Sequence, residues 1–161
     1  MPSKAVRAES GASTASVSLR IRHPSIDPEA ITATLGITPE HCWAQGEPRL
    51  SANGTRIGGT RRDTYWSAVL PDSYEQQTLG PQAAAWQSDP SALLLMQILQ
   101  LKSHQAFFKR IAAEGGQASL VLEIAAEEGA SLRIEPGLMR LLADLGLPVT
   151  CEFVASASID S

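Results

Sequence analysis

Residues 26–37 read IDPEAITATLGI, and residues 134–147 repeat the same pattern as IEPGLMRLLADLGL. In each copy an acidic residue precedes a proline, and a leucine-glycine pair closes the segment. An acidic side chain before a helix can accept a hydrogen bond from a free backbone N–H, and proline suits the first helical position. Glycine after the last turn adopts the left-handed conformation that ends a helix. The pattern therefore predicts short helices over about 28–35 and from Pro136 to Leu145.

Alternating apolar and polar residues predict strands on either side of these helices. The predicted strands cover residues 17–22, 64–70, 120–124, 132–134 and 149–153. Asp89-Pro90 opens a third and longest helix, over about 91–114, which ends at Gly115-Gly116. The order is β-α-β-α-β-β-α-β, and most strands have one apolar face. These features predict an α+β fold, a ferredoxin-like two-layer sandwich with a mainly antiparallel sheet and its helices on one face.

The remaining segments bound this domain and interrupt it. Residues 1–14 are small and polar, which is typical of a disordered tail, and a single α+β domain is expected over 15–157. Residues 38–60 contain several glycines and prolines, and we expect them to form a long irregular loop. Residues 71–88 are polar and rich in glutamine, and we expect a polar connection there. A loop as long as 38–60 is usually functional or mobile.

The composition of the chain argues against two classes of partner, nucleic acids and membranes. The net charge of −4 argues against general affinity for nucleic acid. No apolar stretch is long enough to span a membrane, and residues 1–16 lack the apolar core of a signal peptide. We therefore expect a cytoplasmic protein that does not bind membranes. Its two cysteines, Cys42 and Cys151, are then expected to be free thiols.

The face of the sheet that the helices leave uncovered is a candidate surface. We expect it to carry the polar residues that alternate with the apolar ones: Arg20, Arg22, Glu123, Arg133, Thr150 and Glu152. Opposite charges on neighbouring strands would stabilise one another there. The face is either simply solvated, or it is a surface for self-association or for a partner.

A second candidate surface lies around the 38–60 loop, where arginines and aromatic residues are interleaved. Its members are Trp43, Arg49, Arg61, Arg62, Tyr65 and Trp66. Such a set could stack on bases or bind an anionic partner. Alternatively, the two tryptophans anchor the core or the loop, while Arg61 and Arg62 pair with nearby carboxylates. Both interpretations are open at this level.

Catalysis and metal binding have little support in the sequence. Cys42 follows His41, but neighbours in sequence are seldom the catalytic pair in space, and no acidic residue is placed to orient the histidine. The three histidines are scattered, without the spacing of a metal site. The segment GGTRR at 58–62 could hold a phosphate before a helix, but a strand is predicted to follow. We therefore assign no catalytic residue, no metal ligand and no cofactor.

Several segments together carry a family resemblance. They are Ile26-Asp27-Pro28-Glu29-Ala30-Ile31, Leu35-Gly36-Ile37-Thr38-Pro39, Trp43 to Gly46-Glu47-Pro48, Tyr65-Trp66, Ile134-Glu135-Pro136 and Leu141 to Gly146. Over roughly residues 16–155 the chain resembles a bacterial family known as domain of unknown function 4279. The resemblance implies no activity, cofactor or catalytic residue. Some members of that family look like small proteins of bacterial conflict systems, in which an immunity protein masks a toxin.

The function that these observations favour is a non-enzymatic binding or protein-interaction module, which could be of the immunity type. Its partner would be another protein or a second copy of the chain. The alternative is a ferredoxin-like domain that senses a small molecule or an anion, with a pocket between the 38–60 loop and the sheet. An enzyme is less expected, and nucleic-acid binding least.

Overall fold

The computed structural model describes residues 14–71, 89–126 and 131–155. The expected disordered tail and polar connection therefore lie outside the described residues, apart from Thr14 and Pro71.

Two kinds of element make up this part of the chain. Its helices are α1 (Pro28–Leu35), α4 (Pro90–Leu101), the 3₁₀ turn η4 (Lys102–His104), α5 (Gln105–Ala113) and α6 (Pro136–Leu145). Its strands are β1 (Thr14–His23), β2 (His41–Trp43), β3 (Pro48–Leu50), β4 (Arg56–Thr60), β5 (Thr64–Val69), β6 (Gln117–Ala126) and β7 (Val149–Ala155). Helices α1 and α6 have the bounds expected from the sequence.

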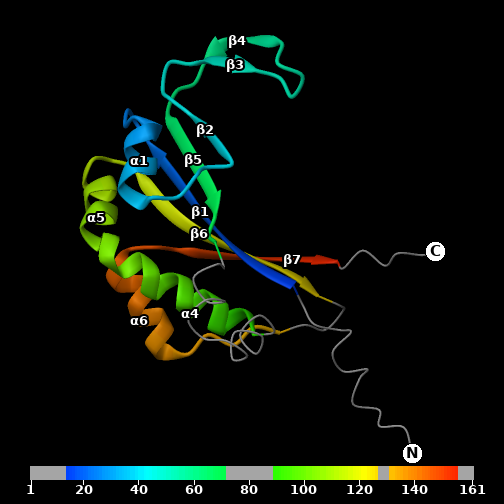
Figure 1. Ribbon diagram of the computed structural model, residues 1–161, viewed down its shortest axis with the longest axis vertical. Helices are drawn as coiled ribbons and strands as arrows, with labels where there is room; N and C mark the ends of the chain where they lie inside the picture. The colour runs from blue at the N-terminus through cyan, green and yellow to red at the C-terminus, as the bar shows by residue number, and fades with distance from the viewer. Residues whose placement is uncertain (1–13, 72–88, 127–130, 156–161) are drawn as a thin grey trace, which may run out of the picture.

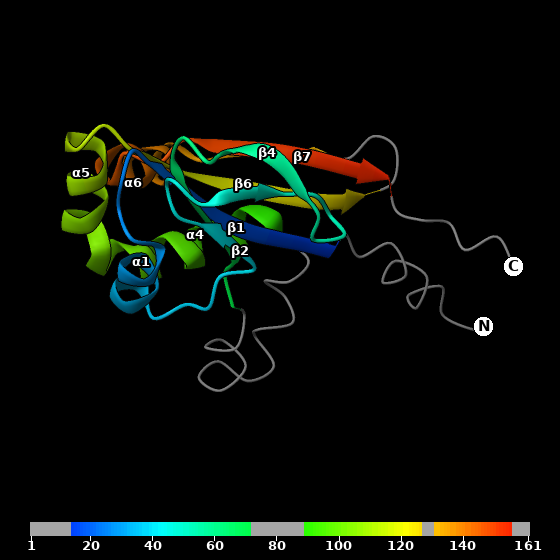
Figure 2. The ribbon, with the colours of Figure 1, turned by 90° about the horizontal axis from the view of Figure 1, so that it is seen from above.

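The strands form one large sheet and one small hairpin. The large sheet has the order β2-β5-β1-β6-β7, and β3 pairs only with β4. All neighbours in the large sheet are antiparallel except β6 and β7, which are parallel. In Figure 2, α1 and α4 lie on the same side of β1, and Figure 1 shows the hairpin standing beyond the end of the sheet where β5 begins. The expected α+β sandwich with a mainly antiparallel sheet is confirmed.

The two helices with the repeated sequence pattern sit in different corners of this sheet. Helix α1 connects β1 to β2. These two strands are not neighbours in the sheet, because β5 lies between them and pairs antiparallel with both. Helix α6 joins the parallel neighbours β6 and β7, as a crossover connection requires. The sequence pattern predicted both helices correctly. The strands that α6 connects are parallel neighbours, whereas the strands that α1 connects are not neighbours.

The ends of α1 and α6 follow from the same residues that predicted them. The Asp27 side chain accepts a hydrogen bond of 2.9 Å from the backbone N–H of Glu29. Glu135, at the matching place before α6, makes no such bond, since its longer side chain is a poorer cap. Gly36 and Gly146 end the helices at φ 69° and 67°, a left-handed conformation that glycine adopts without steric cost.

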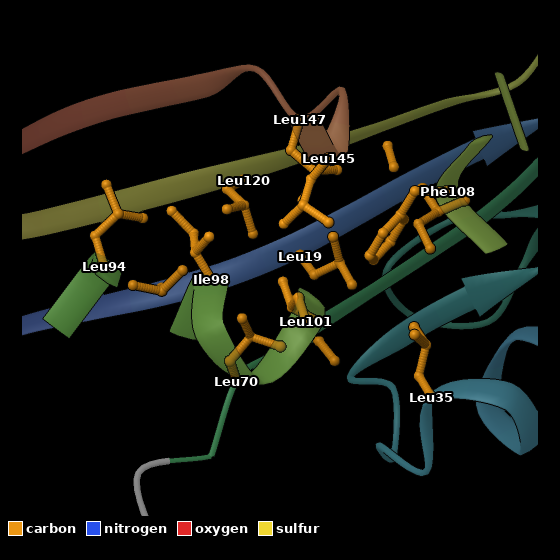
Figure 3. Close-up of a cluster of buried hydrophobic side chains, with 14 of the residues drawn as sticks. Leu19, Leu35, Leu70, Leu94, Ile98, Leu101, Phe108, Leu120, Leu145 and Leu147 are labelled. Carbon is orange, nitrogen blue, oxygen red and sulfur yellow. The ribbon is translucent and has the colours of Figure 1, made fainter. Parts of the chain in front are cut away.

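One hydrophobic core lies between the helices and the sheet. Leu19 and Leu120 extend from neighbouring strands toward Leu94 and Ile98 of α4 (Figure 3). Helix α1 contributes Ile31, which is fully buried in the same cluster. Burial of apolar area stabilises a fold by about 25 cal/mol per Å². This continuous core holds the strands in place, and the opposite face of the sheet carries polar side chains.

Three predicted elements differ from the structure. Residues 38–60 are not irregular, because they contain the short strands β2, β3 and β4. The expected 91–114 helix is interrupted at η4, where the Ser103 hydroxyl donates a 3.2 Å hydrogen bond to the Gln100 carbonyl and competes with the helical pattern. Residues 131–135 form no strand; Leu132 and Ile134 alternate because they pack against the core.

The uncovered face of the sheet also differs from expectation. Glu123 of β6 lies beside Glu152 of β7, so like charges are neighbours there. Arg20 and Arg22 lie opposite Ser119 and Gln117 rather than opposite carboxylates. Arg133 lies outside the strands. This face therefore has an acidic end on β6 and β7 and a basic end at the close of β1.

Candidate functional site

The site begins with two aromatic rings that the sheet register places side by side. Strand β2 pairs with β5 so that Trp43 lies opposite Tyr65. Their ring centres are 4.6 Å apart and their planes differ by 24°, which is a stacked arrangement. Both residues lie on the polar face of the sheet, since Trp66, the neighbour of Tyr65 in β5, is fully buried on the other face. The stacked pair forms a flat, rigid floor.

Two guanidinium groups lie over this floor. The Arg61 guanidinium carbon is 3.9 Å from the centre of the Trp43 ring, and that of Arg22 is 5.6 Å from the Tyr65 ring. Such cation–π contacts contribute about 0.5–1 kcal/mol at exposed sites. The Trp43 ring is therefore in contact with both Tyr65 and Arg61.

Backbone hydrogen bonds fix the segment that carries Arg61. The Arg61 N–H donates a hydrogen bond to the Glu47 carbonyl, and the Arg61 carbonyl accepts one from the Gly46 N–H, both at 2.8 Å. One step further, the Gln45 N–H donates to the Thr64 hydroxyl at 3.1 Å, and that hydroxyl donates to the buried Ile26 carbonyl. The base of the hairpin is thus tied to the domain, and Arg61 is held at a defined place.

The stacked Trp43–Tyr65 pair and the side chains around it line an open cavity of about 250 Å³. We call it the arginine cavity. It is lined by Arg22, Trp43, Arg49, Thr60, Arg61, Arg62, Asp63 and Tyr65. Four positive side chains therefore face one carboxylate, although the whole chain carries a net charge of −4. Guanidinium groups bind carboxylates and phosphates through paired hydrogen bonds, so the cavity is suited to oxyanions.

Asp63 neutralises little of this charge. Its carboxylate is 3.7 Å from the nearest nitrogen of Arg22, and the two side chains are 45% and 65% exposed. An exposed pair of this length contributes at most about 1 kcal/mol. Within the described residues, Arg49, Arg61 and Arg62 form no ion pair. Most of the positive charge in the arginine cavity is therefore available to a ligand.

Comparison with known proteins places the whole site within a known family. A family model described as a domain of unknown function (DUF4279) matches residues 13–153. The chain belongs to the DUF4279 family. No curated protein and no solved structure matches the chain. Every residue of the arginine cavity lies inside the range of the DUF4279 match.

Five of the six residues proposed from the sequence line the arginine cavity. The exception is Trp66, whose place in that surface was predicted wrongly. It is fully buried on the helix side of the sheet, and its indole N–H donates a 3.0 Å hydrogen bond to the Thr32 hydroxyl of α1. Successive residues of a strand point to opposite faces, so Tyr65 and Trp66 could not share one surface.

Sequence reasoning missed three members of the cavity. Thr60 and Asp63 flank the two predicted arginines and carried no signal of their own. Arg22 was assigned to the sheet face, and it does lie there. Only the pairing of β1 with β5 brings it beside Tyr65. The order of strands was needed to find it.

The geometry offers no catalytic pair at the cysteines. Cys42 lies opposite Trp66 and His41 opposite Ser67, so the two neighbours point to different faces of the sheet. Burial raises the pKa of the Cys151 thiol, which lowers its share of the nucleophilic thiolate. Over residues 14–71, 89–126 and 131–155, no three His, Cys, Asp or Glu side chains come together as metal ligands. None of the helices in these ranges is both long and apolar enough to cross a bilayer.

Proposed function

We propose that this DUF4279 protein is a non-enzymatic binding module of the bacterial cytoplasm that recognises an acidic partner protein through the arginine cavity. One observation carries the proposal: four arginines and one carboxylate surround a pre-stacked Trp43–Tyr65 floor. Tryptophan, tyrosine and arginine are the residues that most often dominate the binding energy of protein interfaces. An acidic partner would supply the carboxylates that the cavity lacks.

The fixed position of Arg61 supports tight and specific binding. A free arginine loses side-chain entropy when it binds, and that loss subtracts from affinity. Arg61 is held over Trp43, and its backbone is held by Gly46 and Glu47. Part of this entropy is therefore lost on folding, before the partner arrives.

A protein partner fits these contacts better than a nucleic acid does. Sequence-tolerant binding of single strands depends on bases that stack on free aromatic faces. The Trp43 ring is already in contact with Tyr65 and Arg61. Carboxylates of a folded partner need only the guanidinium groups.

The test is affinity capture from a native lysate with three immobilised forms of the protein. The wild type is compared with Arg61→Gln/Arg62→Gln and with the control Arg133→Gln/Arg140→Gln, which loses the same charge on exposed residues outside the cavity. We expect one protein to be retained by the wild type and the control and lost from the cavity variant. Titration calorimetry with that purified partner should then show at least about a tenfold loss of affinity for the cavity variant. Equal retention by all three forms would rule out this site.

A small anion is a second candidate ligand, because a cavity of about 250 Å³ is concave enough to enclose one. Phosphate and citrate would then raise the melting temperature as their concentration rises, by mass action. The rise should vanish in Arg61→Gln/Arg62→Gln and persist in Arg133→Gln/Arg140→Gln. If neither anion shifts the melting temperature of the wild type, the small-anion candidate fails.

A further inference from the structure

A second cavity continues the arginine cavity around the end of β1. Its volume is about 360 Å³, and it is lined by Arg22, His23, Pro24, Arg62, Asp63, Gly115 and Gln117. Three of these residues, Arg22, Arg62 and Asp63, also line the arginine cavity. The two cavities therefore adjoin at the exposed Arg22–Asp63 pair, and we call them together the groove.

The two halves of this groove differ in chemistry. The arginine cavity holds Arg49 and Arg61 in addition to the shared residues. The second cavity adds the Gln117 side chain and the glycine at 115, which are neutral. Its one further titratable group, His23, is only 5% exposed. One half suits oxyanions, and the other suits a chain with polar backbone groups.

Charge farther along the sheet limits where an acidic ligand can lie. Gln117 lies opposite Arg22 at the basic end of β6, while Glu123 lies opposite Ser16 and beside Glu152. The six residue-to-residue steps from 117 to 123 span about 20 Å of strand. An acidic ligand that continued along β6 would meet two carboxylates, whereas the groove over Arg22 presents guanidinium groups.

We infer that the ligand is an extended acidic segment of a protein, which lies along the whole groove. This inference rests on the proposed function and adds the form of the partner. One carboxylate occupies the arginine cavity near Arg61 and Arg62. The segment then crosses Arg22, where a second carboxylate replaces Asp63, and its backbone reaches Gln117. Replacement is inexpensive because the Arg22–Asp63 distance is 3.7 Å and both groups are solvated.

The inference is tested by titration of the full chain with three probes: a labelled, acetylated hexaglutamate peptide, inorganic phosphate, and the single-stranded oligonucleotide hexathymidylate. Gln117→Glu places a negative charge in the second cavity only. Thr150→Glu is the matched control, since it adds the same charge to an exposed position of the sheet on β7. Circular dichroism verifies that each variant is folded.

We expect Gln117→Glu to weaken hexaglutamate binding about tenfold through like-charge repulsion and to leave phosphate binding within about twofold. Thr150→Glu should leave both unchanged, and Asp63→Asn should strengthen peptide binding several-fold. If Arg61→Gln/Arg62→Gln abolishes peptide binding while Gln117→Glu has no effect, the groove inference fails and the binding site stands. If neither variant changes peptide binding, both fail. Tighter binding of hexathymidylate than of hexaglutamate would overturn the assignment to a protein segment.

Discussion

Nε2 of His23 lies 2.9 Å from a carboxylate oxygen of Glu114, although the two residues are 91 positions apart in the chain. The other ring nitrogen, Nδ1, accepts hydrogen bonds from the backbone N–H groups of Ser25 at 3.0 Å and Ile26 at 2.8 Å. Because Nδ1 is an acceptor, the neutral ring carries its proton on Nε2, and this N–H donates a hydrogen bond to Glu114. This buried imidazole connects the end of β1 to the end of α5 at the wall of the second cavity.

Replacing His23 should expose how much this connection stabilises the fold. His23→Ala leaves two backbone N–H groups without an acceptor, and we expect a loss of about 1–3 kcal/mol in the free energy of unfolding. His23→Asn keeps an acceptor oxygen near the position of Nδ1 and should recover part of the loss. Urea unfolding measures both. Equal stability of the alanine and asparagine variants would contradict the assigned role of Nδ1.

Glu114 should make stability depend on pH in the acid range. The hydrogen bond from Arg110 lowers the pKa of this carboxyl below its ordinary value of 4.5, desolvation opposes the shift, and the hydrogen bond from His23 adds to it. A carboxyl with a lower pKa in the folded state stabilises the fold above its unfolded pKa, and this contribution is lost as pH falls through the folded value.

The measurement is urea unfolding of the wild type and of Glu114→Gln as the pH is lowered from about 5 to about 3. Wild-type stability should fall more steeply than that of Glu114→Gln, which has no proton to gain at this site. Glu135→Gln is a suitable control, because Glu135 pairs with the exposed Arg133. Parallel curves for the wild type and Glu114→Gln would refute the prediction.

Gly116 should resist even the smallest substitution. A Cβ atom there would lie 2.8 Å from the Arg22 carbonyl oxygen, 2.8 Å from His23 and 2.9 Å from Ile111. Since one neighbour is backbone, Gly116→Ala should cost about 1–3 kcal/mol of unfolding free energy through overpacking. Gly137→Ala in α6 meets nothing within 4 Å and should instead stabilise by about 0.5–1 kcal/mol. Thermal unfolding that moves both variants in the same direction would count against this account.

Two tryptophans of this chain should separate stability from binding. Trp66→Ala removes a fully buried side chain and its hydrogen bond to Thr32, so we expect a loss of about 3–5 kcal/mol. Trp43→Ala removes an aromatic stack and a cation–π contact at the surface, worth about 1 kcal/mol together. Hexaglutamate binding should be lost in Trp43→Ala. A Trp43→Ala protein that unfolds as easily as Trp66→Ala would show that both residues belong to the core.

Much of the fold could be predicted from the sequence because its signals are local. The proline and glycine that bound α1 and α6 act within one turn, and alternation in β1 reports burial on one face. The β3–β4 hairpin gave no such signal, since every residue of both strands is exposed and no apolar face alternates. The pairing of β6 with β7 depends on contacts across the whole domain, so no local pattern specified it.

The candidate site was predictable only in part for the same reason. Arg61, Arg62 and Tyr65 are close in sequence and stay close in space, whereas Arg22 arrives from another strand. Trp66 was grouped with this surface by residue type, although its alternation with Ala68 and Leu70 already indicated the buried face. Where residue type and periodicity disagreed, periodicity gave the correct location.

The separate pairing of β3 with β4 has a consequence for how this family can diversify. The hairpin completes its strand pairing within itself, and all residues of its two strands are exposed. Changes of length or sequence at its tip therefore cost the domain little stability. Arg49 sits on this hairpin, while Trp43, Tyr65 and Arg22 sit on the sheet. Substitutions in the hairpin can thus change one wall of the groove while the other wall, and the fold behind it, stays the same.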